Sequence, residues 1–328
     1  MKLLVVGGAG YIGSHMVKRL LRDGHEITTF DDFSSGHRDA IVGGEVVEGS
    51  LTDKVLLDAL FRTHGFDAVF HFASFIQVGE SVLQPAKYYR NNLSNTLNLL
   101  DIMVRYGVLR FVFSSTAAVY GEPLHVPIVE THPLAPLNPY GTSKAMVEQV
   151  LRDYEDAYHF HSISLRYFNA CGADPEGELG ERHEPETHLI PLALQAVLGQ
   201  RGALTVFGRD YDTPDGTCIR DYVHVEDLCQ AHVLALHHLM DGGVGDVFNL
   251  GNGAGFSVAE IVAAVERVTG CKVPIIEGSR RAGDPACLVA DASKARRVLG
   301  WQPCYPELDA IISHAWLWEK IKSTKSTR

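Results

Sequence analysis

The first half of the chain alternates short apolar runs with amphipathic stretches, which predicts strands joined by helices. The run 3–6 has no polar face, as expected of a strand buried on both sides of a parallel sheet. An amphipathic helix follows at about 14–23. The same alternation predicts strands at 26–30, 45–48, 67–72, 109–115 and 161–166, with helices at 53–63, 85–105 and from Pro139. These elements indicate an α/β fold, a doubly wound parallel sheet that binds ligands at the carboxyl ends of its strands.

From about residue 167 the pattern changes. A loop rich in Gly, Glu and Pro, 172–185, precedes a helix at 189–198. A capping box at 257–260 opens a helix to 268, and a terminal helix spans about 307–321 before a polar tail, 322–328, that we expect to fray. We therefore expect a dinucleotide-binding domain at 1–166, with a later return of roughly 221–250, and a smaller α/β substrate-binding lobe at 167–328.

The stretch after the first strand has the features of a phosphate-binding turn. Gly7, Gly10 and Gly13 stand between the apolar run and the helix, where glycine allows a sharp turn and a close approach to a pyrophosphate. The second strand ends in Asp31 and Asp32, roughly 20 residues after the glycines. A carboxylate there can hold ribose hydroxyls and would repel a 2′-phosphate. The sequence therefore predicts a Rossmann-type domain that binds NAD rather than NADP.

Composition narrows the function classes further. The formal net charge of −11 gives no basic footprint for nucleic acid. The six cysteines are scattered without a CxxC pair, which indicates a reducing compartment. The chain enters an apolar run at once, so we expect no leader, and all apolar runs are far shorter than a membrane span. We expect a cytoplasmic protein without a membrane or nucleic-acid partner.

A second informative stretch follows Pro139. Tyr140 and Lys144 are four residues apart and so lie on one face of the predicted helix. An ammonium beside a phenol favours the phenolate, so we expect Lys144 to lower the pKa of Tyr140 from its usual value near 10. The pair would then act as a general base that removes a hydroxyl proton while hydride leaves the same carbon.

Beyond these two motifs, further segments carry a family resemblance, at 7–15, 71–73, 78–81, 88–92, 119–121, 138–141, 166–169, 220–225 and 290–294. Jointly they resemble the extended short-chain dehydrogenases, and within these the NAD-dependent epimerases of UDP-hexoses. The resemblance implies UDP-galactose and UDP-glucose as substrates, a tightly held NAD and a homodimer. It also implies a reversible reaction in which NAD takes a hydride from C4, the 4-keto sugar turns, and the hydride returns to the other face.

The resemblance also implies site residues. Tyr140 would take the proton of the 4-hydroxyl, Lys144 would hold the nicotinamide ribose, and Thr116 would hydrogen-bond the reacting oxygen. The implied cofactor contacts are Gly7, Gly10, Tyr11, Ile12, Gly13, Asp31, Asp32, Ser50, Leu51, Phe72, Ala73, Asn91, Ser114, Tyr140, Lys144 and Phe168. The implied substrate contacts are Thr116, Asn169, His188, Leu189, Arg220, Arg281, Asp284 and Leu288.

Three positions depart from the family pattern. Ile76 stands where some members have a lysine near the cofactor, and Ser50 replaces a frequent aspartate that contacts adenine. Leu288 stands where hexose-specific members often have tyrosine, at the position whose bulk excludes C2 N-acetyl groups. Leucine is smaller than tyrosine, so we expect UDP-GlcNAc and UDP-GalNAc to be interconverted at least slowly.

Other functions compete with this interpretation. Sugar-nucleotide dehydratases of the same fold carry an Asp-Glu pair where this chain has Ala117 and Ala118, which cannot move protons. An epimerase or decarboxylase acting on a uronic acid stays open. A non-catalytic NAD-sensing protein would typically lose Tyr140 or Lys144, and both are present. We predict no metal site at 183–188, because the two histidines are five apart and Pro185 breaks a helix.

Overall fold

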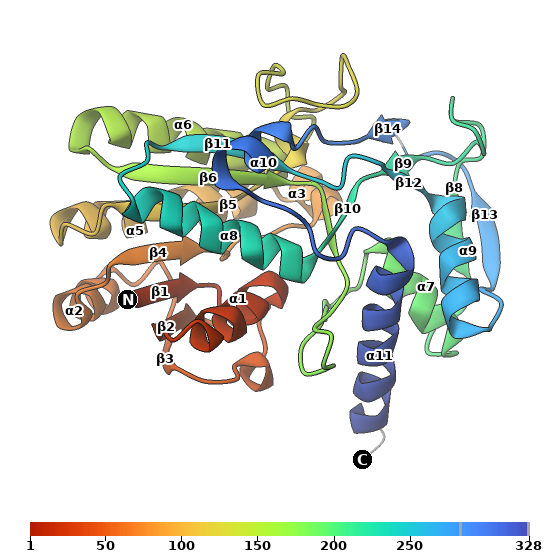
Figure 1. Ribbon diagram of the computed structural model, residues 1–328, viewed down its shortest axis with the longest axis horizontal. Helices are drawn as coiled ribbons and strands as arrows, with labels where there is room; N and C mark the ends of the chain where they lie inside the picture. Colours follow the sequence, from red (N-terminus) through yellow and green to blue (C-terminus); the bar gives the residue numbers. More distant parts are fainter. Residues whose placement is uncertain (282–283, 327–328) are drawn as a thin grey trace.

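Seven parallel strands form the central sheet of the part of the chain described by the computed structural model, residues 1–281 and 284–326 (Figure 1). Their order across the sheet is β11-β6-β5-β4-β1-β2-β3. The bounds are β1 (Lys2–Val6), β2 (Glu26–Asp31), β3 (Glu45–Glu48), β4 (Ala68–His71), β5 (Arg110–Thr116), β6 (His161–Tyr167) and β11 (Asp246–Leu250). The predicted doubly wound parallel sheet is thereby confirmed.

The apolar run of β1 is continuous because helices cover both faces of the sheet. Leu3 and Val5 pack into a core on one face, Leu4 and Val6 into a core on the other, and all four are at most 1% exposed. Full burial of each such side chain contributes roughly 1.5–3 kcal/mol. Such a strand belongs at the centre of the sheet, and β1 pairs with β2 on one side and β4 on the other.

Two layers of helices enclose the sheet. On one face lie α1 (Tyr11–Arg22), α8 (Val225–Met240) and α10 (Ser293–Leu299). On the other lie α2 (Lys54–His64), α5 (Asn95–Arg105) and α6 (Pro139–Tyr158). The Asp53 carboxylate caps α2, and the Asn138 side chain caps α6 by accepting a hydrogen bond from the Gly141 amide at 2.9 Å.

The stretch predicted as one helix at 85–105 is more divided than its periodicity suggests. It comprises α4 (Pro85–Tyr88), a π-helical turn η2 (Tyr89–Ser94) and α5, preceded by α3 (Val78–Leu83). In the wider turn the buried Asn92 side chain bonds the backbone N–H and C=O of Phe75 and donates to the Ser143 hydroxyl. Such a turn accommodates one extra residue, which a repeat of apolar positions does not reveal.

A smaller group of elements lies beyond the carboxyl ends of the strands, at the right of Figure 1. Its core is formed by α7 (Leu189–Val197), α9 (Val258–Thr269) and α11 (Leu308–Ser326), with the paired strands β8 (Leu204–Phe207) and β13 (Ile275–Gly278). The predicted capping box of α9 is present. The division of the chain at residue 166 stays a prediction.

Short elements connect the two parts. One small sheet is the parallel pair β7 (Asn169–Cys171) and β10 (Tyr222–His224). Another has three strands in the order β12 (Phe256–Ser257), β9 (Ile219–Arg220) and β14 (Cys287–Leu288). Two single 3-10 turns are η1 (Arg38–Ala40) and η3 (Ala117–Val119).

Two predicted helix ends are wrong. The first helix begins at Tyr11 instead of residue 14, because Gly10 already stands at its N-cap. The tail expected to fray continues α11 through Ser326, and residues 327–328 lie outside the described part. One reason for the longer helix is that the Lys322 ammonium pairs at 2.5 Å with the Glu319 carboxylate, which is 2% exposed.

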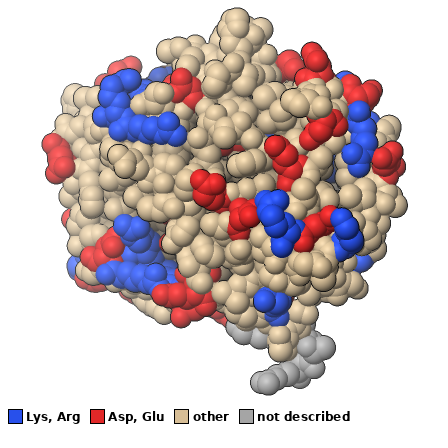
Figure 2. Space-filling view, turned by 45° about the vertical axis from the view of Figure 1, so that its right-hand side comes forward, with Lys and Arg blue, Asp and Glu red and all other residues tan. Residues whose placement is uncertain are grey.

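The surface and helices bear on possible partners. On the face shown in Figure 2, acidic and basic side chains are interspersed and do not form one field of a single sign. Among the helices that the structure describes, none has the length and hydropathy of a membrane span.

Candidate active site

The glycine turn brings the ends of β1 and β4 into backbone contact. Gly7 has φ +78°, and a Cβ added to it would lie 2.4 Å from the Ala73 nitrogen. A Cβ on Gly13 would lie 2.1 Å from the Gly7 carbonyl oxygen. Only glycine fits at these two positions, and α1 starts at once after the turn without a side-chain cap. Its first amides are therefore available to a phosphate.

Asp31 closes the far side of this turn. Its carboxylate is buried and accepts hydrogen bonds at 2.9 Å from the amides of Ala9 and Phe33. Burial raises the pKa of Asp31, and these two hydrogen bonds oppose that rise. The remaining lone pairs can accept ribose hydroxyls. Asp32 is exposed and accepts from the Ser34 amide, so its role toward a cofactor stays a prediction.

These features fit NAD. The tight turn excludes any side chain where the backbone would approach the pyrophosphate, the free end of α1 attracts its charge, and Asp31 offers a fixed acceptor. Tyr11 and Ile12 open α1, while Phe72 and Ala73 follow β4 beside Gly7.

The structure gathers the predicted catalytic residues at the same edge of the sheet. Thr116 ends β5, and its hydroxyl lies close enough to the phenol of Tyr140, on the first turn of α6, to lower the pKa of that phenol. One turn further, the Lys144 ammonium donates at 2.8 Å to both the Ser74 hydroxyl and the Ser114 carbonyl oxygen. Tyr140 and Lys144 are 9% and 2% exposed, so both functional groups are withdrawn from bulk water.

Burial dominates the acidity of this pair. It raises the pKa of Tyr140, and the hydrogen bond from Thr116 only opposes that rise. Burial also lowers the pKa of Lys144 to about 7, against the attraction of Glu148. The pKa of Tyr140 is therefore raised, where the sequence predicts that it is lowered. The Lys144 ammonium bonds Ser74 and Ser114, and desolvation is the largest effect on the pKa of Tyr140.

A buried polar network lies directly behind Lys144. Glu148, one turn further along α6, receives the Arg166 guanidinium at 2.9 Å and the Ser115 hydroxyl at 2.5 Å. Arg166 also donates to the Tyr120 hydroxyl at 2.9 Å, which in turn donates to Asn249 at 2.6 Å. The network connects β5, β6, α6 and β11 and fixes the helix that carries the catalytic pair.

The residues predicted to bind substrate fall into two groups. In the first, the Asn169 amide bonds the Asp221 carbonyl oxygen, which places Asn169 beside the strand of Arg220. Arg220 ion-pairs with Asp284, and Leu288 lies opposite Arg220 on the neighbouring strand. The side chain of Leu288 packs against the cluster that contains Phe168. Arg281 stacks 4.1 Å from the centre of the Phe207 ring.

The second group lies at the start of α7. His188 is the N-cap of this helix and Leu189 its first residue. The Nδ1 atom of His188 faces the Glu181 carboxylate at 2.5 Å, so only Nε2 is left for a substrate.

Four other positions that the sequence singles out have few polar contacts. Ser50 accepts a hydrogen bond from the Thr52 hydroxyl, and Leu51 is buried with its carbonyl oxygen bonded to Asn98. Asn91 donates to Asn92. Ile76 is 39% exposed, and its apolar side chain cannot form the charged contact of the lysine that some family members have there. Their roles toward a cofactor stay predictions.

Sequence reasoning did not single out three residues that contact or support the predicted catalytic pair. Ser74 holds the Lys144 ammonium, and Glu148 and Arg166 form the ion pair behind it. Ser74 follows Ala73 just after a strand, and a hydroxyl at that edge of the sheet is a signal of a site residue. The partners of Glu148 lie on other strands, and although Arg166 stands in a segment with the family resemblance, nothing local pairs it with Glu148.

The fold and the site together define an enzyme that pairs a dinucleotide turn with a buried tyrosine and lysine at the same sheet edge. The family described as NAD dependent epimerase/dehydratase family matches residues 3–251. The chain belongs to this family, so NAD is its cofactor and the predicted family is confirmed.

The chain is similar over nearly its whole length to curated relatives. A UDP-glucose 4-epimerase of Halalkalibacterium halodurans is 50% identical over 320 residues, covering 98% of this chain and 96% of the relative. The crystal structure of UDP-glucose 4-epimerase from Brucella ovis in complex with NAD is 48% identical with a TM-score of 0.94, covering 96% and 97%. The structure of the UDP-Glc/GlcNAc 4-epimerase from Campylobacter jejuni is 46% identical with a TM-score of 0.86, covering 98% and 99%.

The buried ion pair behind the site generates a stability prediction. Glu148→Gln leaves the Arg166 charge buried without its partner, so we expect unfolding to become easier by about 3–5 kcal/mol. Urea denaturation followed by circular dichroism measures this change. As a control, Asp58→Asn breaks the solvent-screened pair with Arg105, which we expect to change the stability far less. Equal effects of the two substitutions would contradict the prediction.

Proposed function

We propose that the protein interconverts UDP-galactose and UDP-glucose by reversible inversion at C4 of the sugar, with NAD bound throughout. The observation that carries the proposal is the buried contact between Tyr140 and Thr116 at the edge of the sheet where the dinucleotide turn lies. When bound, NAD accepts a hydride from C4 and returns it. Family membership and full-length similarity to UDP-glucose 4-epimerases support the same reaction.

The chain supplies the proton chemistry. The Tyr140 oxygen removes the proton of the 4-hydroxyl and later returns it, while the Thr116 hydroxyl holds the reacting oxygen. A phenolate in a dry site needs positive charge nearby, because burial alone keeps the proton on Tyr140. Lys144 would supply part of that charge, although burial lowers its pKa to about 7, and the cationic nicotinamide of bound NAD would supply more.

Two groups of side chains in the smaller lobe would bind the nucleotide part of the substrate. Arg220 and Arg281 offer forked donors to the diphosphate, and Asn169, His188 and Leu189 border the same region. The sugar would face Leu288 and Phe168, which are apolar and leave it free to turn.

We further propose that the protein is a cytoplasmic homodimer. The support is the exposed apolar side chain of Met146 on α6, 42% exposed, near the exposed Val82 and Leu83 of α3, which packs against the same helix. A monomer at micromolar concentration in light scattering would refute the dimer.

The reaction is tested with UDP-galactose and no added NAD. We expect the purified protein to produce UDP-glucose by NMR, and Tyr140→Phe to reduce the rate by at least about 100-fold with an unchanged NAD content, because it removes the general base. Tyr158→Phe is the matched control, since Tyr158 lies 48% exposed at the other end of the same helix. A Tyr140→Phe variant as fast as wild type would overturn the assignment of the base.

Leu288 generates a prediction about specificity. We propose that UDP-GlcNAc and UDP-GalNAc are interconverted, as the name of the Campylobacter jejuni relative indicates for that protein. Leu288→Tyr is expected to lower the rate with N-acetyl sugars at least about tenfold more than the rate with UDP-galactose, because it fills the space beside C2. Leu288→Met, of similar volume, is the control. No turnover of either N-acetyl sugar by the wild type would contradict the proposal.

A further inference from the structure

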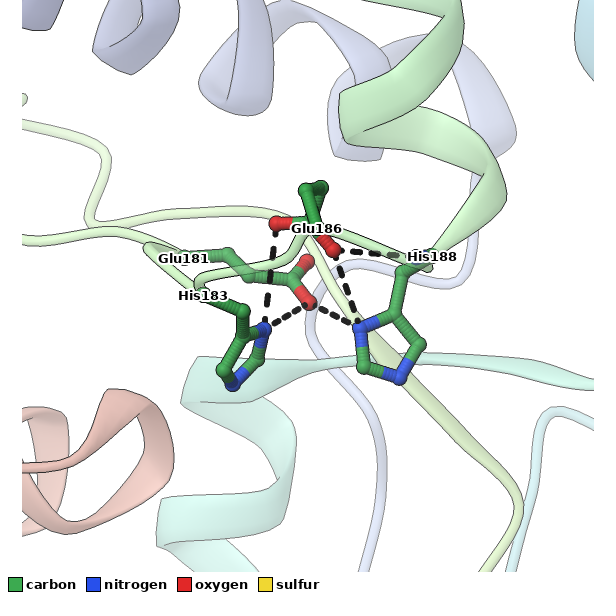
Figure 3. A group of neighbouring side chains, drawn as sticks. All are labelled: Glu181, His183, Glu186 and His188. Atoms are coloured by element: carbon green, nitrogen blue, oxygen red, sulfur yellow. Dashed lines mark hydrogen bonds and ion pairs between the residues drawn. The ribbon is translucent and has the colours of Figure 1, made fainter. Parts of the chain in front are cut away.

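Four side chains converge just before α7, away from the contacts of Tyr140 (Figure 3). They are Glu181, His183, Glu186 and His188, which we name the Glu/His cluster. Each offers one ligand atom, and these atoms all lie within 4.8 Å of one another. The sequence did not predict this, because the spacing does not fit a helix. The structure brings the four together from a loop, where helical spacing does not apply.

The distances have the scale of a four-coordinate metal centre. His183 Nδ1 lies 3.1 Å from Glu181 Oε1 and 3.8 Å from Glu186 Oε2. His188 Nδ1 lies 2.5 Å from Glu181 Oε1 and 3.4 Å from Glu186 Oε1. A tetrahedral ion with bonds of about 2.0–2.2 Å separates its ligand atoms by about 3.3 Å. Two of the four N–O distances in the cluster are shorter than this separation and two are longer.

The second observation is that no well-directed hydrogen bond satisfies these ligand atoms, although they lie at ion-pair distances. Among the described residues, one buried atom on each side chain has no hydrogen-bond partner: Glu181 Oε1, His183 Nδ1, Glu186 Oε2 and His188 Nδ1. The Glu181 and Glu186 side chains are only 5% and 7% exposed. The nitrogen and oxygen atoms are close, yet their angles do not suit an N–H···O bond. Figure 3 shows both rings turning Nδ1 toward the carboxylates.

The surroundings hold these ligands in place. The other oxygen of Glu186 accepts the amides of Thr187 and His188 at 2.8 and 2.9 Å. The Trp318 indole of α11 donates to the Glu181 backbone oxygen at 3.0 Å, and the ring of Tyr11 on α1 meets the edge of His183. Such outer contacts orient metal ligands.

A second cluster of possible ligands differs from the Glu/His cluster because it already contains a cation. Asp174, Glu176 and Glu178 also converge, but the Lys18 ammonium lies within 2.7–3.1 Å of all three carboxylates. A lysine already supplies the positive charge there. In the Glu/His cluster the nitrogen atoms are imidazole nitrogens, the commonest protein ligands of transition metals.

We propose that the Glu/His cluster binds one Zn²⁺ ion through its two imidazoles and two carboxylates. Imidazole and carboxylate ligands in four-coordinate geometry suit zinc. Four protein ligands make the site a structural one, because no position is left for a reacting molecule. The ion joins the loop before α7 to the start of that helix. It also fixes the ring of His188 so that Nε2 points away from the metal.

The test measures zinc on full-length, NAD-containing protein purified without a polyhistidine tag. Bound metal is removed with a chelator, and ZnSO₄ is then titrated by isothermal calorimetry with metal content checked by mass spectrometry. We expect one zinc per chain and a higher melting temperature with zinc, because a ligand that binds only the folded state stabilises it.

The main variant is Glu186→Gln. Its amide oxygen can still accept the amides of Thr187 and His188, while the other ligand oxygen becomes an NH₂ group. We expect zinc affinity to fall at least about 100-fold and the melting temperature to lose its response to zinc. Glu184→Gln, exposed on the same loop and outside the cluster, is the matched control and should bind zinc like wild type. His183→Gln is a second test if Glu186→Gln loses NAD or folded structure.

Either of two results would overturn the proposal. If wild type binds zinc no more tightly than Glu186→Gln or His183→Gln, any bound ion lies elsewhere. If the chelated wild type takes up no zinc, both imidazoles carry protons and the cluster is two ion pairs. Neither result depends on the sugar reaction, because the readouts are metal content and thermal stability.

Discussion

The close backbone contact at Gly7 fixes more of the site than any other single feature. Because a side chain at Gly7 would strike Ala73, and one at Gly13 would strike Gly7, the ends of β1, β4 and α1 have one relative position. Ser74 follows Ala73 directly and accepts the Lys144 ammonium. The turn that would approach the cofactor phosphates therefore also determines where α6 can place its lysine, and with it Tyr140. Phosphate binding and proton transfer share one constraint.

Desolvation then determines what the catalytic pair can do. A buried phenol holds its proton and a buried ammonium releases one, and both shifts are present here. The Glu148 carboxylate opposes the fall in the pKa of Lys144, but it is already paired with the Arg166 guanidinium. The cofactor's own charge is thus part of the acid–base machinery.

Local sequence predicted those features that local chemistry determines. The apolar run of β1, Pro139 in the first turn of α6 and the capping box at Ser257 each act within a few residues, so six strands of the central sheet and most helices are predicted. The seventh strand, β11, and the short strands of the smaller part are not. The π-helical turn at Tyr89–Ser94 and the partners of Lys144 depend on packing between distant segments. The Glu/His cluster was dismissed because helical spacing was assumed for a segment that is a loop.

The proposed reaction imposes opposite demands on the two ends of the substrate. A 4-keto sugar that must present both faces to the same cofactor needs a firm hold on its nucleotide and few directional contacts around its ring. The structure has this asymmetry, since Arg220 and Arg281 carry charge and forked donors, whereas Leu288 and Phe168 offer only apolar contact. Specificity at C2 would then depend on the volume beside Leu288. Polar recognition there would restrict the turning that the reaction requires.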